Sequence, residues 1–183
     1  MLPESINEGV KRLTKSCEFG IKRDVLVEEL AELLEANNRV HLHLSKWSQP
    51  KLIEEFADVF LMVSQVCVYL GEESLGEYVE NYEKKNQMIE MKDELTFLQK
   101  AMHLIWCVSK MRRDPDIIKN YEDFRASVWL VAEVLDKERA GLHETQADEV
   151  LKELYSVMEY KLKRQIKRQE GIDDGSDSAE TSN

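Results

Sequence analysis

Apolar positions along most of this chain fall on one face when each segment is drawn as a helix, and breaker residues between the segments are few. Pro50 suits a helix start, whereas Gly71 and Gly141 suit helix ends. Ser5 and Asp24 are placed to cap the first two helices. The pattern predicts helices at about residues 5–20, 24–44, 51–70, 74–85, 93–112, 121–140 and 145–169.

The third segment differs from the others because residues 59–70 are apolar almost all round the helical wheel. A helix of this kind is normally covered by neighbours on several sides. We therefore expect an all-α fold, a helical bundle in which residues 51–70 form the central helix. Only 7 Gly and 3 Pro among 183 residues, with 43% hydrophobic residues, agree with long helices around a real core.

The formal net charge of −11 disfavours a nucleic-acid polymer as partner, because such binders usually carry a basic surface. A nucleotide remains compatible if a divalent cation lies between carboxylates and phosphates. Residues 171–183 have almost no apolar side chains, so we expect a disordered acidic tail.

Cys17, Cys67 and Cys107 are odd in number and none lies in a close-spaced pair, which favours buried thiols in a reducing compartment. The first residues contain no apolar signal core, and the longest apolar stretch is too short to span a bilayer. We expect a soluble cytoplasmic protein with no membrane partner.

Two carboxylate pairs carry the candidate chemistry. On the second predicted helix Glu29 falls inside the apolar arc and Glu32 lies at its edge, whereas Glu28 is further round, towards solvent. On the third, Glu55 lies within apolar surroundings and Asp58 follows three residues on. Most such pairs are simply solvated, but two inward pairs on consecutive antiparallel helices can converge on one point.

Four carboxylates about 4 Å apart would repel by roughly 4 kcal/mol per pair at an effective dielectric near 20. Such a cluster requires protonation or a cation, and oxygen-only ligands favour Mg²⁺ or Mn²⁺. His41 and His43 lie outside both motifs, which counts against a bundle with Glu-x-x-His ligands to iron.

The segments EELAEL (28–33) and IEEFADV (53–59) resemble the EExxE and ExxD signature of MazG-like nucleotide pyrophosphohydrolases, a superfamily that includes dimeric dUTPases and phosphoribosyl-ATP pyrophosphatases. The resemblance covers about residues 5–90. It implies a four-helix catalytic unit at 1–90 that hydrolyses a nucleoside or deoxynucleoside triphosphate to the monophosphate and pyrophosphate. Glu29, Glu32, Glu55 and Asp58 would hold Mg²⁺, and the catalytic Glu28 would ligate a second ion or orient the water.

The substrate contacts are expected from Lys84, Lys85 and Asn86, near the end of the fourth predicted helix, and from Trp47, which is placed to stack on a base. The alternatives are a solvated helix end for the first three and a core-covering role for Trp47.

Residues 91–170 are expected to form further helices and can be aligned with the first half as a degenerate copy, in which Leu130 and Val150 replace Glu29 and Glu55. A true copy would make the chain a pseudo-dimer; otherwise a homodimer is expected. The basic run at 161–169 is read as a charged surface strip rather than a nucleic-acid or lipid contact.

Two other functions stay open at this point. One is an inactive helical scaffold or interaction module with the same frame, and the other is a carboxylate-bridged iron or manganese redox bundle.

Overall fold

The computed structural model describes residues 2–15, 19–41, 48–69, 71, 97–113 and 144–171. Within these residues the secondary structure is entirely helical, which confirms the all-α prediction. The helices predicted at 74–85 and 121–140, and the tail beyond residue 171, lie outside the described residues. The described helices are α1 (Glu4–Thr14), α2 (Phe19–His41), α3 (Ser48–Tyr69), α5 (Phe97–Arg113) and α7 (Glu144–Gln169).

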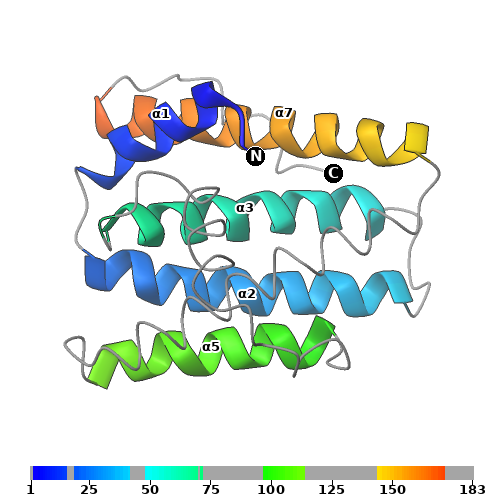
Figure 1. The fold of residues 1–183 in the computed structure, drawn as a ribbon, viewed down its shortest axis with the longest axis horizontal. Coiled ribbons are helices and arrows are strands. Elements are labelled where there is room, and N and C mark those ends of the chain that lie inside the picture. Colours follow the sequence, from blue (N-terminus) through cyan, green and yellow to red (C-terminus); the bar gives the residue numbers. More distant parts are fainter. Residues whose placement is uncertain are drawn as a thin grey trace, which may run out of the picture.

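The helices are stacked in layers around α3 (Figure 1). On one side α3 packs against α2, and α2 in turn packs against α5. On the other side α3 packs against α1 and α7, which also contact each other. The prediction that residues 51–70 form the central helix is therefore confirmed. Figure 1 also shows that α2 and α3 run in opposite directions, so their carboxylate pairs lie on neighbouring antiparallel helices.

Two hydrophobic clusters meet on opposite faces of α3, which explains why this helix is apolar all round. Burying apolar surface on both faces stabilises a helix far more than its intrinsic propensity does. The first cluster joins α2, α3 and α5 through Leu26, Leu30, Leu33, Val59, Met62, Val63, Val66, Cys67, Leu104 and Val108. The second joins α1, α3 and α7 through Ile6, Val10, Leu13, Ala57, Leu61, Met158 and Leu162.

Two predicted N-caps are wrong. Helix α1 begins at Glu4, so Ser5 lies within the helix and its hydroxyl donates to a carboxylate oxygen of Glu159 on α7 instead. Helix α2 begins at Phe19, which places Asp24 inside the helix. In both cases the helix extends past the expected cap because the preceding residues also adopt helical backbone.

The contact between α1 and α7 depends on a glycine. A Cβ built on Gly9 would lie 3.2 Å from Cδ1 of Leu162, so the small residue lets the two helices approach closely. Arg12 on α1 and Glu170 on α7 form an ion pair further along the same contact.

Helices from both halves of the chain share these layers, because α5 covers α2 and α7 covers α1 and α3. The proposed boundary near residue 90 and the degenerate-repeat hypothesis stay predictions, since Leu130 lies outside the described residues. Among the helices that the structure describes, none combines the length and apolar character needed to cross a membrane.

Candidate metal centre

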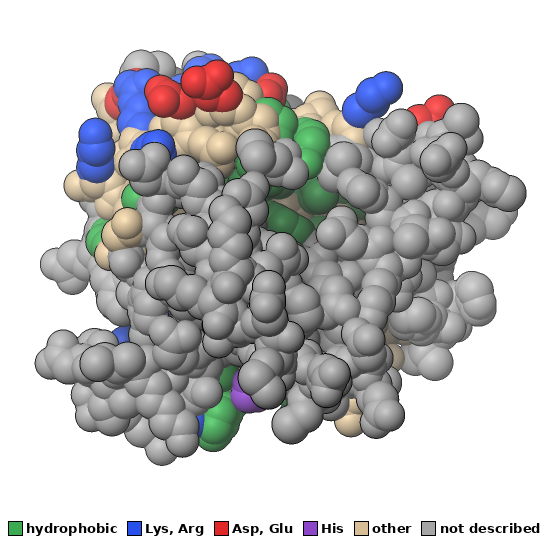
Figure 2. Space-filling view, in the orientation of Figure 1, with side chains coloured by type: hydrophobic (Ala, Val, Ile, Leu, Met, Phe, Trp, Pro, Cys, Tyr) green, Lys and Arg blue, Asp and Glu red, His purple; other side chains and the backbone are tan. Residues whose placement is uncertain are grey.

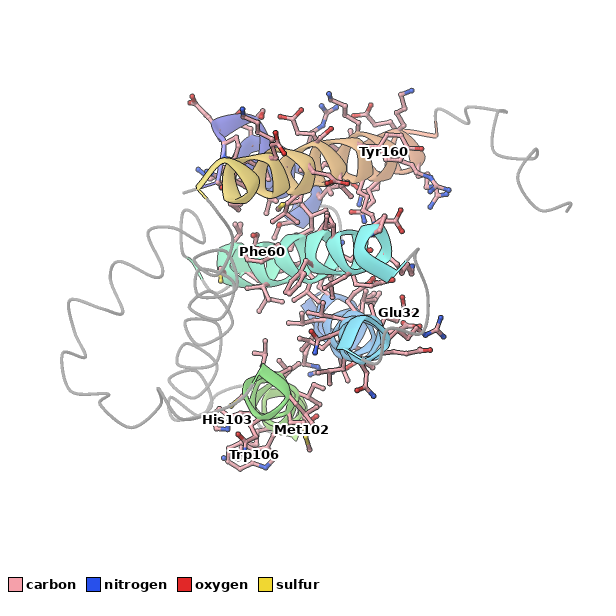
Figure 3. The ribbon with its side chains drawn as sticks, turned by 90° about the vertical axis from the view of Figure 1, so that its right-hand side faces the viewer. Glu32, Phe60, Met102, His103, Trp106 and Tyr160 are labelled. Atoms are coloured by element: carbon pink, nitrogen blue, oxygen red, sulfur yellow. The ribbon has the colours of Figure 1, made fainter. Side chains whose placement is uncertain are left out.

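Three glutamates converge at the interface between α2 and α3. One carboxylate oxygen from each of Glu29, Glu32 and Glu55 can be chosen so that the three atoms lie within 4.8 Å of one another. Figure 3 shows Glu32 on α2, next to α3. The i, i+3 spacing puts Glu29 and Glu32 on one face of α2, and the antiparallel packing brings Glu55 of α3 to that face.

Glu55 is the most unusual member of this cluster. Its side chain is 1% exposed, and it lies on the side of α3 that also buries Val59 and Met62. Lys51, one helical turn earlier, forms an ion pair with Oε1 of Glu55. Neither carboxylate oxygen of Glu55 accepts a well-aligned hydrogen bond from any described residue. A buried carboxylate needs a compensating cation, and the ammonium of Lys51, on a side chain that is 57% exposed, fills this role in part.

Asp58 lies beside the three glutamates but its carboxylate is already engaged. Oδ2 of Asp58 accepts a hydrogen bond from the ammonium group of Lys161 on α7. The side chain of Asp58 is 19% exposed. The structure therefore brings the four predicted ligands into one region, but only the three glutamates form a convergent group among the described residues.

The electrostatics of the cluster favour protons or cations. Burial raises the pKa of Glu29 to about 7, and the negative charges of Asp58, Glu32 and Glu55 add to this effect. The pKa of Glu32 is also raised, by desolvation and by the charge of Glu55. Burial raises the pKa of Asp58 as well, against the opposing effect of the Lys161 ammonium. A divalent cation would relieve the same repulsion without protonation.

The donor set fits a hard divalent cation. Two oxygens on opposite sides of Mg²⁺ are about 4.2 Å apart, since each lies about 2.1 Å from the ion. The glutamate oxygens lie within 4.8 Å of one another, which is close to this spacing. Three carboxylates leave room for the water and phosphate ligands that Mg²⁺ usually retains. These residues fit Mg²⁺ or Mn²⁺.

Two lysines at the cluster were not predicted as site residues. Lys51 lies four residues before Glu55, a spacing at which helical side chains meet, so the sequence did contain this signal. Lys161 is 103 residues from Asp58 and reaches it only because α7 packs on α3. No spacing rule links residues that far apart.

The remaining predicted site residues are placed as follows. Glu28 is exposed on α2, as the helical wheel predicted, and its charge contributes to raising the pKa of Glu32. Lys84, Lys85, Asn86 and Trp47 lie outside the described residues, so their proposed substrate contacts stay predictions.

Comparisons of the chain with protein-family models, with curated proteins and with solved structures found no match. The resemblance to MazG-like pyrophosphohydrolases therefore depends on the motif residues and on where the fold puts them.

Proposed function

We propose that this protein is a Mg²⁺-dependent nucleoside triphosphate pyrophosphohydrolase of the MazG-like kind. Its products would be a nucleoside or deoxynucleoside monophosphate and pyrophosphate. The observation that carries the proposal is the convergence of Glu29, Glu32 and Glu55 from two antiparallel helices, with Glu55 almost fully buried. Glu55 has Lys51 as a counter-charge, but three carboxylates converge here, and a divalent cation would offset the negative charge that one lysine leaves.

In this proposal Glu29, Glu32 and Glu55 hold the ion, and Asp58 joins them once it exchanges its lysine partner. When bound, the ion would neutralise phosphate charge and lower the pKa of the attacking water. Because Glu55 is buried, the inner end of the cluster lies within the α2–α3 interface. The exposed Glu28 and Glu32 mark the side from which a nucleotide would approach.

Glu28 is the candidate base because its side chain is exposed and it directly precedes Glu29 of the cluster. It would accept a proton from water as the water oxygen bonds to the α-phosphorus. The bond from the α-phosphorus to the bridging oxygen breaks at the same centre, and pyrophosphate leaves with that oxygen. Catalysis would come mainly from positioning and electrostatic stabilisation.

One observation favours the inactive-scaffold alternative. Lys51 and Lys161 form ion pairs with Glu55 and Asp58, so two of the four carboxylates have counter-charges without metal. The redox alternative gains no comparable support, since the convergent group found among the described residues consists of carboxylates only.

Pyrophosphate release from a panel of NTPs and dNTPs, with and without Mg²⁺, tests the proposal. We expect stoichiometric pyrophosphate and monophosphate from the preferred nucleotide, and no products when Mg²⁺ is chelated. Glu28→Gln should lower kcat by about 10²-fold or more while leaving metal binding intact. Glu35→Gln, on the exposed face of α2, is the matched control and should turn over normally. No turnover and no metal binding would instead support the scaffold.

A further inference from the structure

Lys161 differs from the other cations of the basic run at 161–169. Its side chain is 24% exposed, whereas that of Lys163, two residues on, is 75% exposed and lies 3.8 Å from Glu159 on its own helix. Figure 2 shows charged side chains of both signs gathered along the edge formed by α1 and α7, where a charged strip was predicted. Lys161 instead points from α7 towards α3.

The position of Lys161 is fixed by the packing of α7. Met158, three residues before Lys161, and Leu162, directly after it, are both buried in the cluster shared with α1 and α3. From this anchored helix the Lys161 ammonium donates to Oδ2 of Asp58 and lies 3.4 Å from the backbone carbonyl oxygen of Glu54. The contact is therefore a specific, partly buried ion pair rather than a chance surface encounter.

Asp58 cannot give the same lone pairs to an ammonium group and to a metal ion. It accepts from Lys161 in this structure, and its charge is felt by Glu29 within the cluster. A divalent cation that recruits Asp58 must displace the ammonium or share the carboxylate with it. The displaced ammonium would stay within reach of the cluster, because α7 remains packed on α3.

We propose that Lys161 is a resident counter-ion that competes with the divalent cation for Asp58, and that the ammonium released by metal binding contacts a phosphate group of the substrate. The phosphate contact rests on the proposed function, since only a phosphate-bearing substrate gives the released ammonium a partner. A lysine ammonium suits this role because it is a compact point charge on a flexible stem.

The competition between the Lys161 ammonium and the metal for Asp58 is tested by titrating Mn²⁺ alone into the full-length chain. Calorimetry then measures the affinity of the chain for Mn²⁺. Lys161→Gln should bind Mn²⁺ about fivefold more tightly or better, which corresponds to the roughly 1 kcal/mol of a partly exposed ion pair. Lys163→Gln, on the same helix, should match the wild type within about twofold. Lys161→Arg keeps the charge and should also behave as the wild type. If Lys161→Gln fails to fold, Lys161→Met keeps the apolar stem and serves in its place.

The phosphate contact is tested with inorganic pyrophosphate in the presence of saturating Mn²⁺. Lys161→Gln should bind pyrophosphate about tenfold more weakly, although it binds the metal more tightly. Opposite changes for metal and pyrophosphate would not follow from a merely structural role. Unchanged or weaker Mn²⁺ binding by Lys161→Gln would overturn the competition, and unchanged pyrophosphate binding would overturn the phosphate contact.

The outcomes also separate this inference from the proposed function. Equal Mn²⁺ binding by the wild type and Lys161→Gln would reject the competition while leaving the metal centre in place. Binding by Lys161→Gln alone would support the competition and show that the wild-type chain is not a metalloenzyme. No binding by either chain would overturn both proposals.

Discussion

Replacement of Glu55 by glutamine tests two effects of the carboxylate cluster: the repulsion that destabilises the metal-free fold, and the proposed binding of a metal ion. The substitution keeps the shape of a side chain that is 1% exposed while removing its negative charge. It also removes a candidate metal ligand. We expect Glu55→Gln to raise the thermal stability of the metal-free protein and to abolish its response to Mg²⁺.

The magnitude follows from the geometry of the cluster. Two charges at the 4.8 Å limit of the cluster repel by roughly 3.5 kcal/mol at an effective dielectric of 20, and Glu55 has two such neighbours, Glu29 and Glu32. The ion pair with Lys51, whose side chain is 57% exposed, stabilises the folded protein by only about 1 kcal/mol. Solvent screening and partial protonation of Glu29 reduce the repulsion. A net gain of about 1–3 kcal/mol remains, or about 2–10 °C in Tm.

The assay is thermal unfolding by circular dichroism, with and without Mg²⁺, at about pH 8, which is above the pKa of about 7 of Glu29. Mg²⁺ binding to the folded state should raise the Tm of the wild type. At a Mg²⁺ concentration of 100 Kd, the gain in the free energy of unfolding is about 2.7 kcal/mol. Glu55→Gln should show no such rise. Glu35→Gln, whose carboxylate is 63% exposed and paired with Arg39, is the control and should follow the wild type in both conditions.

A lower Tm for metal-free Glu55→Gln than for the wild type would refute this reasoning. It would mean that the Lys51 pair outweighs the repulsion and that the cluster is stable without a cation. An unchanged Mg²⁺ response in the variant would remove Glu55 from the metal site.

Three further predictions concern pH and packing. The pKa of Glu29 is raised from 4.5 to about 7, so between these pH values the native state holds a proton that the unfolded state has lost. The stability of the metal-free protein should therefore fall as pH rises through this window. Denaturant titrations at several pH values should show a loss of roughly 1–3 kcal/mol after solvent screening. Leu30→Ala removes a fully buried side chain from the α2–α3 core and should cost about 2–5 kcal/mol in urea unfolding, and a cost below about 1 kcal/mol would contradict the described packing. Gly9→Leu should overpack the contact with Leu162 and cost about 1–3 kcal/mol by the same measurement, whereas a stabilised variant would show that α1 and α7 are not in close contact.

Much of the fold was predictable because burial imposes a periodic pattern on each helix. The all-round apolar character of residues 59–70 identified the central helix, and the observed α3 is packed on both faces. Helix starts were less predictable, since Ser5 and Asp24 have side chains suited to capping but lie within longer helices. Local hydrogen-bonding preference did not determine where these helices began.

The candidate site was predictable only where its residues share a helix face. The inward placement of Glu29 and Glu55 followed from their positions in apolar arcs, and the structure brings both into the convergent group. The engagement of Asp58 by Lys161 depends on the packing of α7 against α3, which no local pattern encodes. The roles of these residues as ligands stay predictions.

Diffraction from crystals soaked in Mn²⁺, recorded for its anomalous signal, would show directly whether the three glutamates bind a metal ion. We expect an anomalous peak at the α2–α3 interface, about 2.1–2.3 Å from carboxylate oxygens of Glu29, Glu32 and Glu55. We also expect Asp58 to have turned from Lys161 towards the ion. Saturating Mn²⁺ with no peak at the cluster, and with Lys51 and Lys161 still paired as they are here, would contradict the metal centre.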